Sequence, residues 1–292
     1  VGDVCARLLE MTGHSVEREF YVNDAGKQIQ TLGASVVARM REARGEAALF
    51  PEDGYPGNYV KEIAAKLLAD GVLPSDETRD VRAIALKAAE ILKAVQKKDL
   101  DALNVRFDVW FSEAPLHEGG AVEATLDDMT ARGHIYEADG ARWFRSTAFG
   151  DEKDRVVVRS NGEKTYFAAD MAYHRNKFIE RGFERVMNVW GADHHGYIPR
   201  MKAIVSALGK PPEALEIVLV QFVNLTGGRM GKRTGNMVTL REVIDEVGRD
   251  ATRFFFLLRS YNTTLEFDLD LAKRESSDNP VYYVQYGHAR IA

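Results

Sequence analysis

The sequence has 292 residues, of which 45% are hydrophobic and 28% charged, so the chain can bury a substantial core and does not belong to the disordered class. Its 39 basic and 44 acidic residues give a net charge of -5, which excludes a globally basic nucleic-acid-binding protein but allows a local basic face. The single cysteine, Cys5, excludes an intramolecular disulfide and a cysteine-cluster zinc site. A single cysteine also suits a reducing compartment, so we expect a cytoplasmic protein. Since no apolar run approaches membrane-spanning length, we expect no membrane segment.

Secondary-structure patterns alternate along the first half of the chain. Apolar residues recur at helical spacing in several segments, and short alternating runs separate them. The predicted elements are helices over residues 4–11, 28–44, 122–133 and, as a helix-rich block, 58–103, with strands over 17–22 and 105–111.

Residues 134–166 change character. Alternating runs turn at Asp139-Gly140 and at Asn161-Gly162, and both dipeptides favour tight hairpin turns. We therefore expect a small β insertion over this segment.

Beyond the insertion, helices are predicted over 165–182 and 197–209, and strands over 185–191 and 215–223. This strand-helix-strand order is typical of a parallel sheet of the Rossmann type. The predicted fold class is therefore α/β: a Rossmann-type parallel sheet with a helical insertion and a small β insertion.

Three helix starts are marked by capping residues in the last part of the chain. Thr239 and Glu242 form a capping-box pattern, and Asp250 is the expected cap of the next helix. Asn279-Pro280 predicts the start of a final helix, which continues to the last residue.

The stretch "VWGADHHGYIP", residues 189–199, joins a predicted strand to a helix, where ligands bind in doubly wound sheets. Gly191 would allow close backbone approach, Asp193 could accept hydrogen bonds from ribose hydroxyls, and His194 or His195 could contact a base or phosphate. Alternatively, Asp193 is a helix cap and the histidines are ordinary loop residues. Adjacent histidines do not converge on one ion, which disfavours zinc.

Tyr166 and Asp170 lie four residues apart, so they share a helix face if the helix has begun at Tyr166. A hydroxyl beside a carboxylate suits a guanidinium group. The alternative places Tyr166 in the core and Asp170 on the surface. Asp108 and Glu113 flank another strand end and could bind a cation, cap a helix or form a glycosidase-like pair, although nothing else supports the last.

The stretch "GGRMGKRTGNMVTL", residues 227–240, places Lys232 and Arg233 in a glycine-rich loop. A lysine there could neutralise developing phosphate charge, whereas the alternative is a solvated surface turn. The loop lacks the Walker A spacing.

Together these segments resemble the arginyl-tRNA synthetase family, which belongs to class I of the aminoacyl-tRNA synthetases. "GRMGKRTGN" resembles the KMSKS loop of that class, with Arg229 at the first lysine position and Gly231 in place of serine. The segments "FYVNDAGKQI", "TYFAADMAYH", "GADHHGYIPRMKA", "ATRFFFLLRS" and "DNPVYYVQYGHARI" are similar to arginyl-tRNA synthetases of bacterial style, so the resemblance covers essentially the whole chain.

The resemblance implies roles for individual residues. Lys232 and Arg233 would be catalytic, meeting the triphosphate charge. ATP-binding positions would be Gly191, Asp193, His194, Met230 and Lys232, and arginine-binding positions would be Glu113, Tyr166 and Asp170. No bound metal is implied except Mg²⁺ that accompanies ATP.

The implied activity has two steps. Arginine is activated by ATP to arginyl-adenylate with release of pyrophosphate, and the arginyl group is then transferred to tRNA(Arg). The implied partners are arginine, ATP and tRNA(Arg), with no membrane.

Two departures from the family pattern shape what we expect of this chain. The HxGH signature of the class would precede "VGDVCARLLE", and the family's N-terminal tRNA-binding domain is not seen. We expect a catalytic core over residues 1–275 and the start of a helical anticodon-binding domain over 276–292, inactive alone. Alternatives are another KMSKS-type synthetase, of which the cysteinyl enzyme is disfavoured by the single cysteine, and a non-catalytic nucleotide- or tRNA-binding module.

Overall fold

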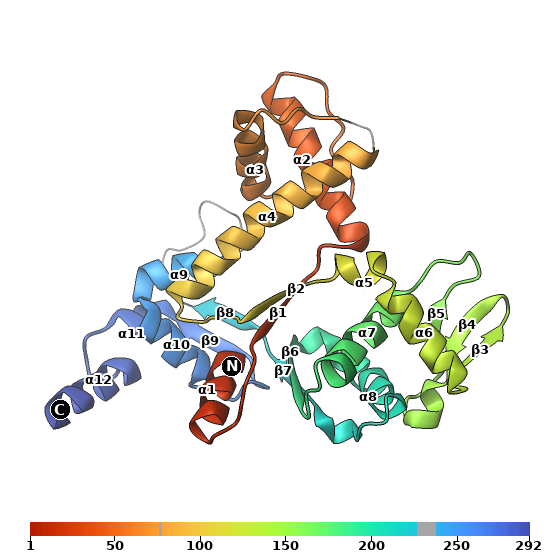
Figure 1. The fold of residues 1–292 in the computed structure, drawn as a ribbon. Helices are drawn as coiled ribbons and strands as arrows, with labels where there is room; N and C mark the ends of the chain where they lie inside the picture. Colours follow the sequence, from red (N-terminus) through yellow and green to blue (C-terminus); the bar gives the residue numbers. More distant parts are fainter. Residues whose placement is uncertain (76–77, 227–237) are drawn as a thin grey trace. The chain divides into compact units, whose positions relative to one another are not determined.

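The computed structural model describes residues 1–75, 78–226 and 238–292 (Figure 1). The chain divides into two compact units. Unit 1 comprises Val1–Val4, Glu113–Asn224 and Arg259–Leu265; unit 2 comprises Cys5–Ser112, Leu225–Leu258 and Glu266–Ala292.

Unit 1 combines a parallel strand pair, the helices beside it and a small antiparallel sheet. Its elements are α5 (Ala114–Glu118), α6 (Ala121–Ala131), β3 (Ile135–Ala138), β4 (Ala141–Phe144), η1 (Ser146–Phe149), β5 (Arg155–Val158), α7 (Tyr166–Arg175), η2 (Asn176–Glu180), β6 (Val186–Gly191), η3 (Ala192–Tyr197), α8 (Ile198–Ala207), η4 (Pro212–Ala214) and β7 (Leu215–Val220).

Strands β6 and β7 pair in parallel, from Val186 opposite Leu215 to Gly191 opposite Val220. Helix α8 connects them and packs against both β7 and α7. Fully buried side chains on α7, α8 and β7, including Met171, Met201 and Ile204, form the core beneath the strand pair. Parallel pairing linked by a helix confirms the predicted α/β class for this part of the chain.

The predicted β insertion is confirmed. Strands β3, β4 and β5 form an antiparallel sheet in that order. Asp139 and Gly140 both have positive φ, 53° and 72°, and join Ala138 to its partner Ala141. These are the backbone angles of the two-residue turn that suits the twist of a hairpin.

Unit 2 contains a helical block, a second parallel strand pair and the C-terminal helices. Its elements are α1 (Gly2–Met11, whose first residues belong to unit 1), β1 (Glu19–Val22), α2 (Gly26–Ala43), α3 (Asn58–Ala69), α4 (Thr78–Ala102), β2 (Val109–Ser112), α9 (Leu240–Val247), α10 (Arg249–Leu257), α11 (Leu269–Lys273) and α12 (Pro280–Ile291). Strands β1 and β2 pair in parallel, and β8 (Val223–Thr226) pairs with β9 (Leu265–Asp268).

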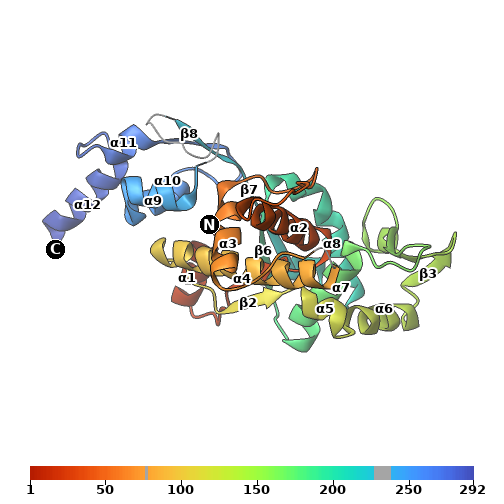
Figure 2. The same ribbon diagram turned by 90° about the horizontal axis from the view of Figure 1, so that it is seen from above.

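Helices α3 and α4 form the helical block predicted over residues 58–103, and α2, predicted as a separate helix, lies beside both of them in both views (Figures 1 and 2). Their apolar faces share one core that includes Val36, Met40 and Val60. At Gly33 a Cβ atom would lie 2.6 Å from the carbonyl oxygen of Val81, so glycine is what permits α2 and α4 to approach so closely.

Two of the three predicted caps are confirmed. Thr239 and Glu242 form a complete capping box at α9, and the Asn279 side chain accepts from the Val281 amide at the start of α12. The prediction for Asp250 is wrong, because α10 begins at Arg249, directly after Gly248. Asp250 therefore lies in the first helical turn, where a negative charge still favours the helix dipole.

Candidate functional site

The end of strand β6 carries the predicted nucleotide-binding residues. Gly191 is the last residue of the strand, and Asp193 and His194 follow in η3. A Cβ atom at Gly191 would lie 2.6 Å from Asp193 Oδ1, so the absence of a side chain leaves room for that carboxylate to fold back over the strand end. The Asp193 side chain is 65% exposed, so its oxygens are accessible to a ligand.

Two aromatic rings lie near His194. Its ring centroid lies 6.1 Å from that of Trp190 and 5.8 Å from that of Tyr197, and its Nε2 lies 3.7 Å from Asp193 Oδ2. The guanidinium of Arg200 lies 4.3 Å from the Tyr197 ring centroid. Flat rings beside an accessible carboxylate are compatible with a base and its ribose.

Helix α7 carries the predicted arginine-binding pair. The helix begins at Tyr166, so Tyr166 and Asp170 share a face, as the spacing predicts. Tyr166 is 59% exposed, which contradicts the alternative of a core tyrosine. Glu113 precedes α5, which packs on α7; its side chain is buried, and its Oε1 lies 3.2 Å from His117 Nε2.

The side chain of Asp170 in unit 1 has a strongly raised pKa. Burial, followed by the neighbouring Glu113 carboxylate, raises the pKa of Asp170 to about 7, against the opposing effect of Lys177 and Arg200. Two carboxylates close enough to influence one another, in a desolvated place, are suited to a cationic ligand. The structure thus brings Glu113 and Asp170 together in one electrostatic group.

Four polar residues of this region were missed by sequence reasoning. His174 and Lys177, both buried, are hydrogen-bonded to the partly buried Asn188, and the buried Nε of Arg200 makes no hydrogen bond within the described residues. The spacing of Asp170, His174 and Lys177 at i, i+4 and i+7 could have indicated a shared helix face. The contact with strand residue Asn188 has no sequence signature.

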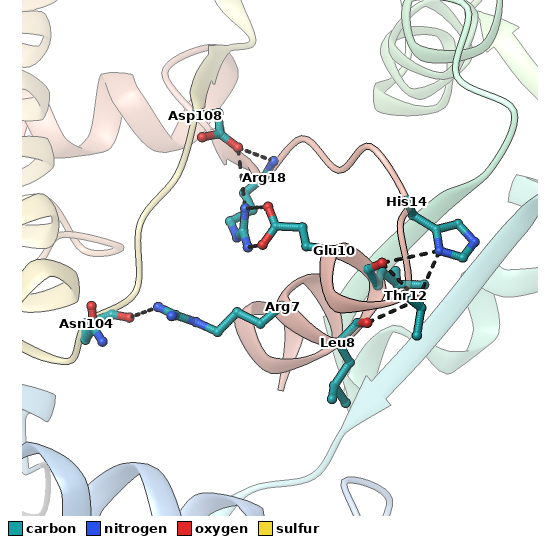
Figure 3. A network of polar contacts seen from close by, with 9 residues as sticks. Arg7, Leu8, Glu10, Thr12, His14, Arg18, Asn104 and Asp108 are labelled. Carbon is teal, nitrogen blue, oxygen red and sulfur yellow. Dashed lines mark hydrogen bonds and ion pairs between the residues drawn. The ribbon is translucent and has the colours of Figure 1, made fainter.

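Asp108 has a structural role. Its Oδ2 accepts from the backbone amide of Arg18 at 2.8 Å, and the Arg18 guanidinium binds Glu10 through two hydrogen bonds of 2.8 and 2.6 Å (Figure 3). Because Asp108 belongs to unit 2 and Glu113 to unit 1, nothing supports the interpretation as a carboxylate pair.

Met230, Lys232 and Arg233 lie outside the described residues. Among the residues that are described, no three His, Cys, Asp or Glu side chains form a metal-binding group. A hollow of about 540 Å³ lies in unit 2, lined by residues of α10 and α12 among others, but it contains none of the predicted site residues. Because the predicted site residues lie at the end of β6 and on α7, we place the candidate site there and not at this hollow.

No helix in the described ranges is sufficiently long and apolar to cross a bilayer.

Comparison with known proteins agrees with these features. Residues 1–256 match the family described as tRNA synthetases class I (R), catalytic domain. Curated proteins named arginine–tRNA ligase are similar over the chain: one from Desulfosudis oleivorans is 53% identical over 100% of this chain and 54% of its own length, and one from Syntrophotalea carbinolica is 52% identical over 99% and 53%. The chain spans about half the length of these relatives.

Solved structures give the same result. A Campylobacter jejuni protein provisionally described as an arginyl-tRNA synthetase superposes with a TM-score of 0.90 at 39% identity, covering 99% of this chain and 64% of its own. Thermus thermophilus arginyl-tRNA synthetase shares the fold, with a TM-score of 0.70 at 21% identity over 99% of this chain and 59% of its own.

Proposed function

Because this chain belongs to the family of class I tRNA synthetase catalytic domains specific for arginine, we propose that it forms the part of an arginine–tRNA ligase that activates arginine. A carboxylate oxygen of arginine attacks the α-phosphorus of ATP, the bond to the bridging oxygen breaks, and pyrophosphate leaves. The arginyl group of the resulting adenylate then passes to a terminal ribose hydroxyl of tRNA(Arg), and AMP leaves.

The observation that carries the proposal is the carboxylate pair of unit 1. Asp170 and Glu113 provide desolvated anionic acceptors, and Tyr166 adds a hydroxyl on the same helix face as Asp170. A guanidinium presents five donors in a planar fork and remains charged at all physiological pH values, so it suits such acceptors better than a neutral side chain does.

We assign the nucleotide to the end of β6. Gly191 allows the nucleotide to approach the backbone, Asp193 accepts from ribose hydroxyls, and His194 lies beside the base. Lys232 and Arg233 would neutralise the charge of the triphosphate, and Met230 would lie near the adenine. Mg²⁺ would be held by the phosphates of ATP, where it would supply charge neutralisation.

The remaining assignments follow from the same proposal. Residues 276–292 would begin the helical anticodon-binding domain, consistent with Asn279 capping α12 and with exposed Tyr283 and Tyr286 on that helix. The protein would act in the cytoplasm, where its tRNA substrate is found.

Arginine-dependent exchange of pyrophosphate into ATP, with tRNA present, tests the function on the full-length gene product. We expect exchange with arginine and none with lysine. ATP binding without any arginine-dependent exchange would instead identify a non-catalytic nucleotide-binding module.

A further inference from the structure

Lys177 is buried in unit 1, which is unusual for lysine. Its side chain is only 6% exposed, its Nζ donates to Asn188 Oδ1 at 3.1 Å, and its Nζ lies 3.9 Å from the ring centroid of Tyr173. Contacts from a strand and from a helix therefore fix the position of the ammonium group.

The hydrogen bonds around Lys177 have one consistent direction. Because Asn188 accepts through Oδ1, its Nδ2 is the donor to His174 Nε2 at 3.3 Å. His174 Nδ1 in turn donates to the backbone carbonyl of Asp170 at 2.8 Å. A chain of donors thus leads from the buried cation to the helical turn that carries Asp170.

The charges that act on Asp170 come from three elements packed on α7. Glu113, at the start of α5, raises the pKa of Asp170 after burial itself; Lys177 of η2 and Arg200 of α8 lower it. Lys177 also lowers the pKa of His174, second to burial. The positive charge of Lys177 therefore lowers the pKa of both Asp170 and His174.

Two further elements contact α7, namely α6 and β5. Their charged side chains include Glu123, which pairs with Lys164, and Arg155, which pairs with Asp151. The charge balance of the Asp170 carboxyl group is therefore set by Glu113 on one side and by Lys177 and Arg200 on the other.

We propose that Lys177 is a positioning residue for arginine recognition: a fixed internal cation, anchored by Asn188, that favours the ionised form of the Asp170 carboxyl group against burial and the Glu113 charge before the ligand arrives. This inference rests on the arginine site proposed above. An ionised carboxylate accepts from a guanidinium, whereas a protonated one presents a donor to a group that is itself all donors.

Carbon-13 NMR of labelled aspartate carboxyl groups in the 292-residue chain measures the charge state directly, with Asp170→Asn identifying the signal. We expect an Asp170 titration midpoint near pH 7 in the unmodified chain. Lys177→Met and Lys177→Gln should raise that midpoint, and Lys177→Arg should restore it. Arg175→Gln is the matched control, since Arg175 lies two residues away, pairs with Glu180 and is more exposed.

An unchanged midpoint in a folded Lys177→Met or Lys177→Gln variant would overturn the proposal. Failure of both neutral variants to fold, while Lys177→Arg folds, would give Lys177 a folding role instead and would equally overturn it.

The arginine readout uses the KM for arginine and for ATP in the full-length gene product. Below the midpoint, Lys177→Met should raise the KM for arginine about tenfold for each unit by which the midpoint rises, leave the KM for ATP unchanged, and recover at higher pH. A packing defect would persist at every pH. If the midpoint shifts but the unmodified protein never uses arginine, the proposed function fails and the coupling of Lys177 to Asp170 stands.

Discussion

His174 and Asp170 are joined by a hydrogen bond of 2.8 Å between the histidine Nδ1 and the aspartate carbonyl oxygen. Because a carbonyl can only accept, Nδ1 carries the proton and Nε2 accepts from Asn188. Burial, followed by the charge of Lys177, lowers the pKa of His174 to about 3, so the ring is neutral at physiological pH. The histidine is therefore a structural link between α7 and β6.

Replacing this histidine should destabilise the chain. His174→Phe removes the buried imidazole and leaves the partly buried Asn188 amide without this acceptor, and losing a buried hydrogen-bond partner costs about 1–3 kcal/mol. Urea unfolding measures the free energy difference. The control is His194→Phe, whose exposed ring predicts a change of about 0.5 kcal/mol or less. Equal effects of the two substitutions would contradict the structural role.

The same histidine should contribute to acid sensitivity. Its pKa is about 3 in the folded chain, against the ordinary histidine pKa of 6.5. The unfolded chain thus binds a proton that the folded chain does not, and stability is fully present above about pH 6.5 and falls as the pH decreases from there to about 3. The slope from this one group approaches about 1.4 kcal/mol per pH unit. Unfolding measured between pH 7 and 5 should show a smaller slope in His174→Phe; an equal slope would assign the acid sensitivity to other groups.

Asp170→Asn should weaken arginine binding and spare ATP. The amide removes the negative charge and presents donors to the guanidinium, and a hydrogen bond to a charged group contributes about 1.5–3 kcal/mol. Calorimetry with arginine, lysine and ATP separates these effects. Parallel losses for arginine and ATP would indicate a folding defect rather than lost recognition.

Lys232→Ala should slow adenylate formation in the full-length gene product while leaving arginine affinity nearly unchanged. Removing one group that stabilises transition-state charge costs roughly 2.7–4 kcal/mol, or ~10²–10³ in rate. Single-turnover kinetics measures the step. A rate within a few-fold of the unmodified protein would show that the triphosphate charge is met elsewhere.

Asp151 and Arg155 form a two-bond ion pair in the β insertion, with both hydrogen bonds at 2.7 Å and the aspartate side chain fully buried. Asp151→Ala leaves a largely buried guanidinium unpaired, which typically costs about 3–5 kcal/mol. The double substitution Asp151→Leu with Arg155→Met should recover most of that loss. Thermal unfolding of the unmodified chain and the two variants checks it, and a double variant as unstable as Asp151→Ala would argue against the buried-charge explanation.

The fold was predictable where local patterns decide it. The Asp139-Gly140 hairpin, the Thr239–Glu242 capping box and the helix-strand alternation of unit 1 follow from short-range rules. The Asp250 cap was displaced because Gly248, with a φ of 82°, ends one helix and begins the next. At the site, Tyr166 and Asp170 share a helix face as their spacing indicates. The contacts of Lys177 and His174 with Asn188 were not predictable, because they depend on how a helix packs on a strand.

The segment Asn176–Glu180 forms a π-helical turn, and such a turn holds one residue more than the α-helical turn it replaces. Its wider winding is consistent with two adjacent side chains, Lys177 and Phe178, both lying in the interior. In a regular helix consecutive residues diverge by about 100°. Loss of the Ile179 codon would therefore preserve the reading frame and allow α-helical winding, in which Lys177 and Phe178 diverge and the interior retains either the cation or the aromatic ring.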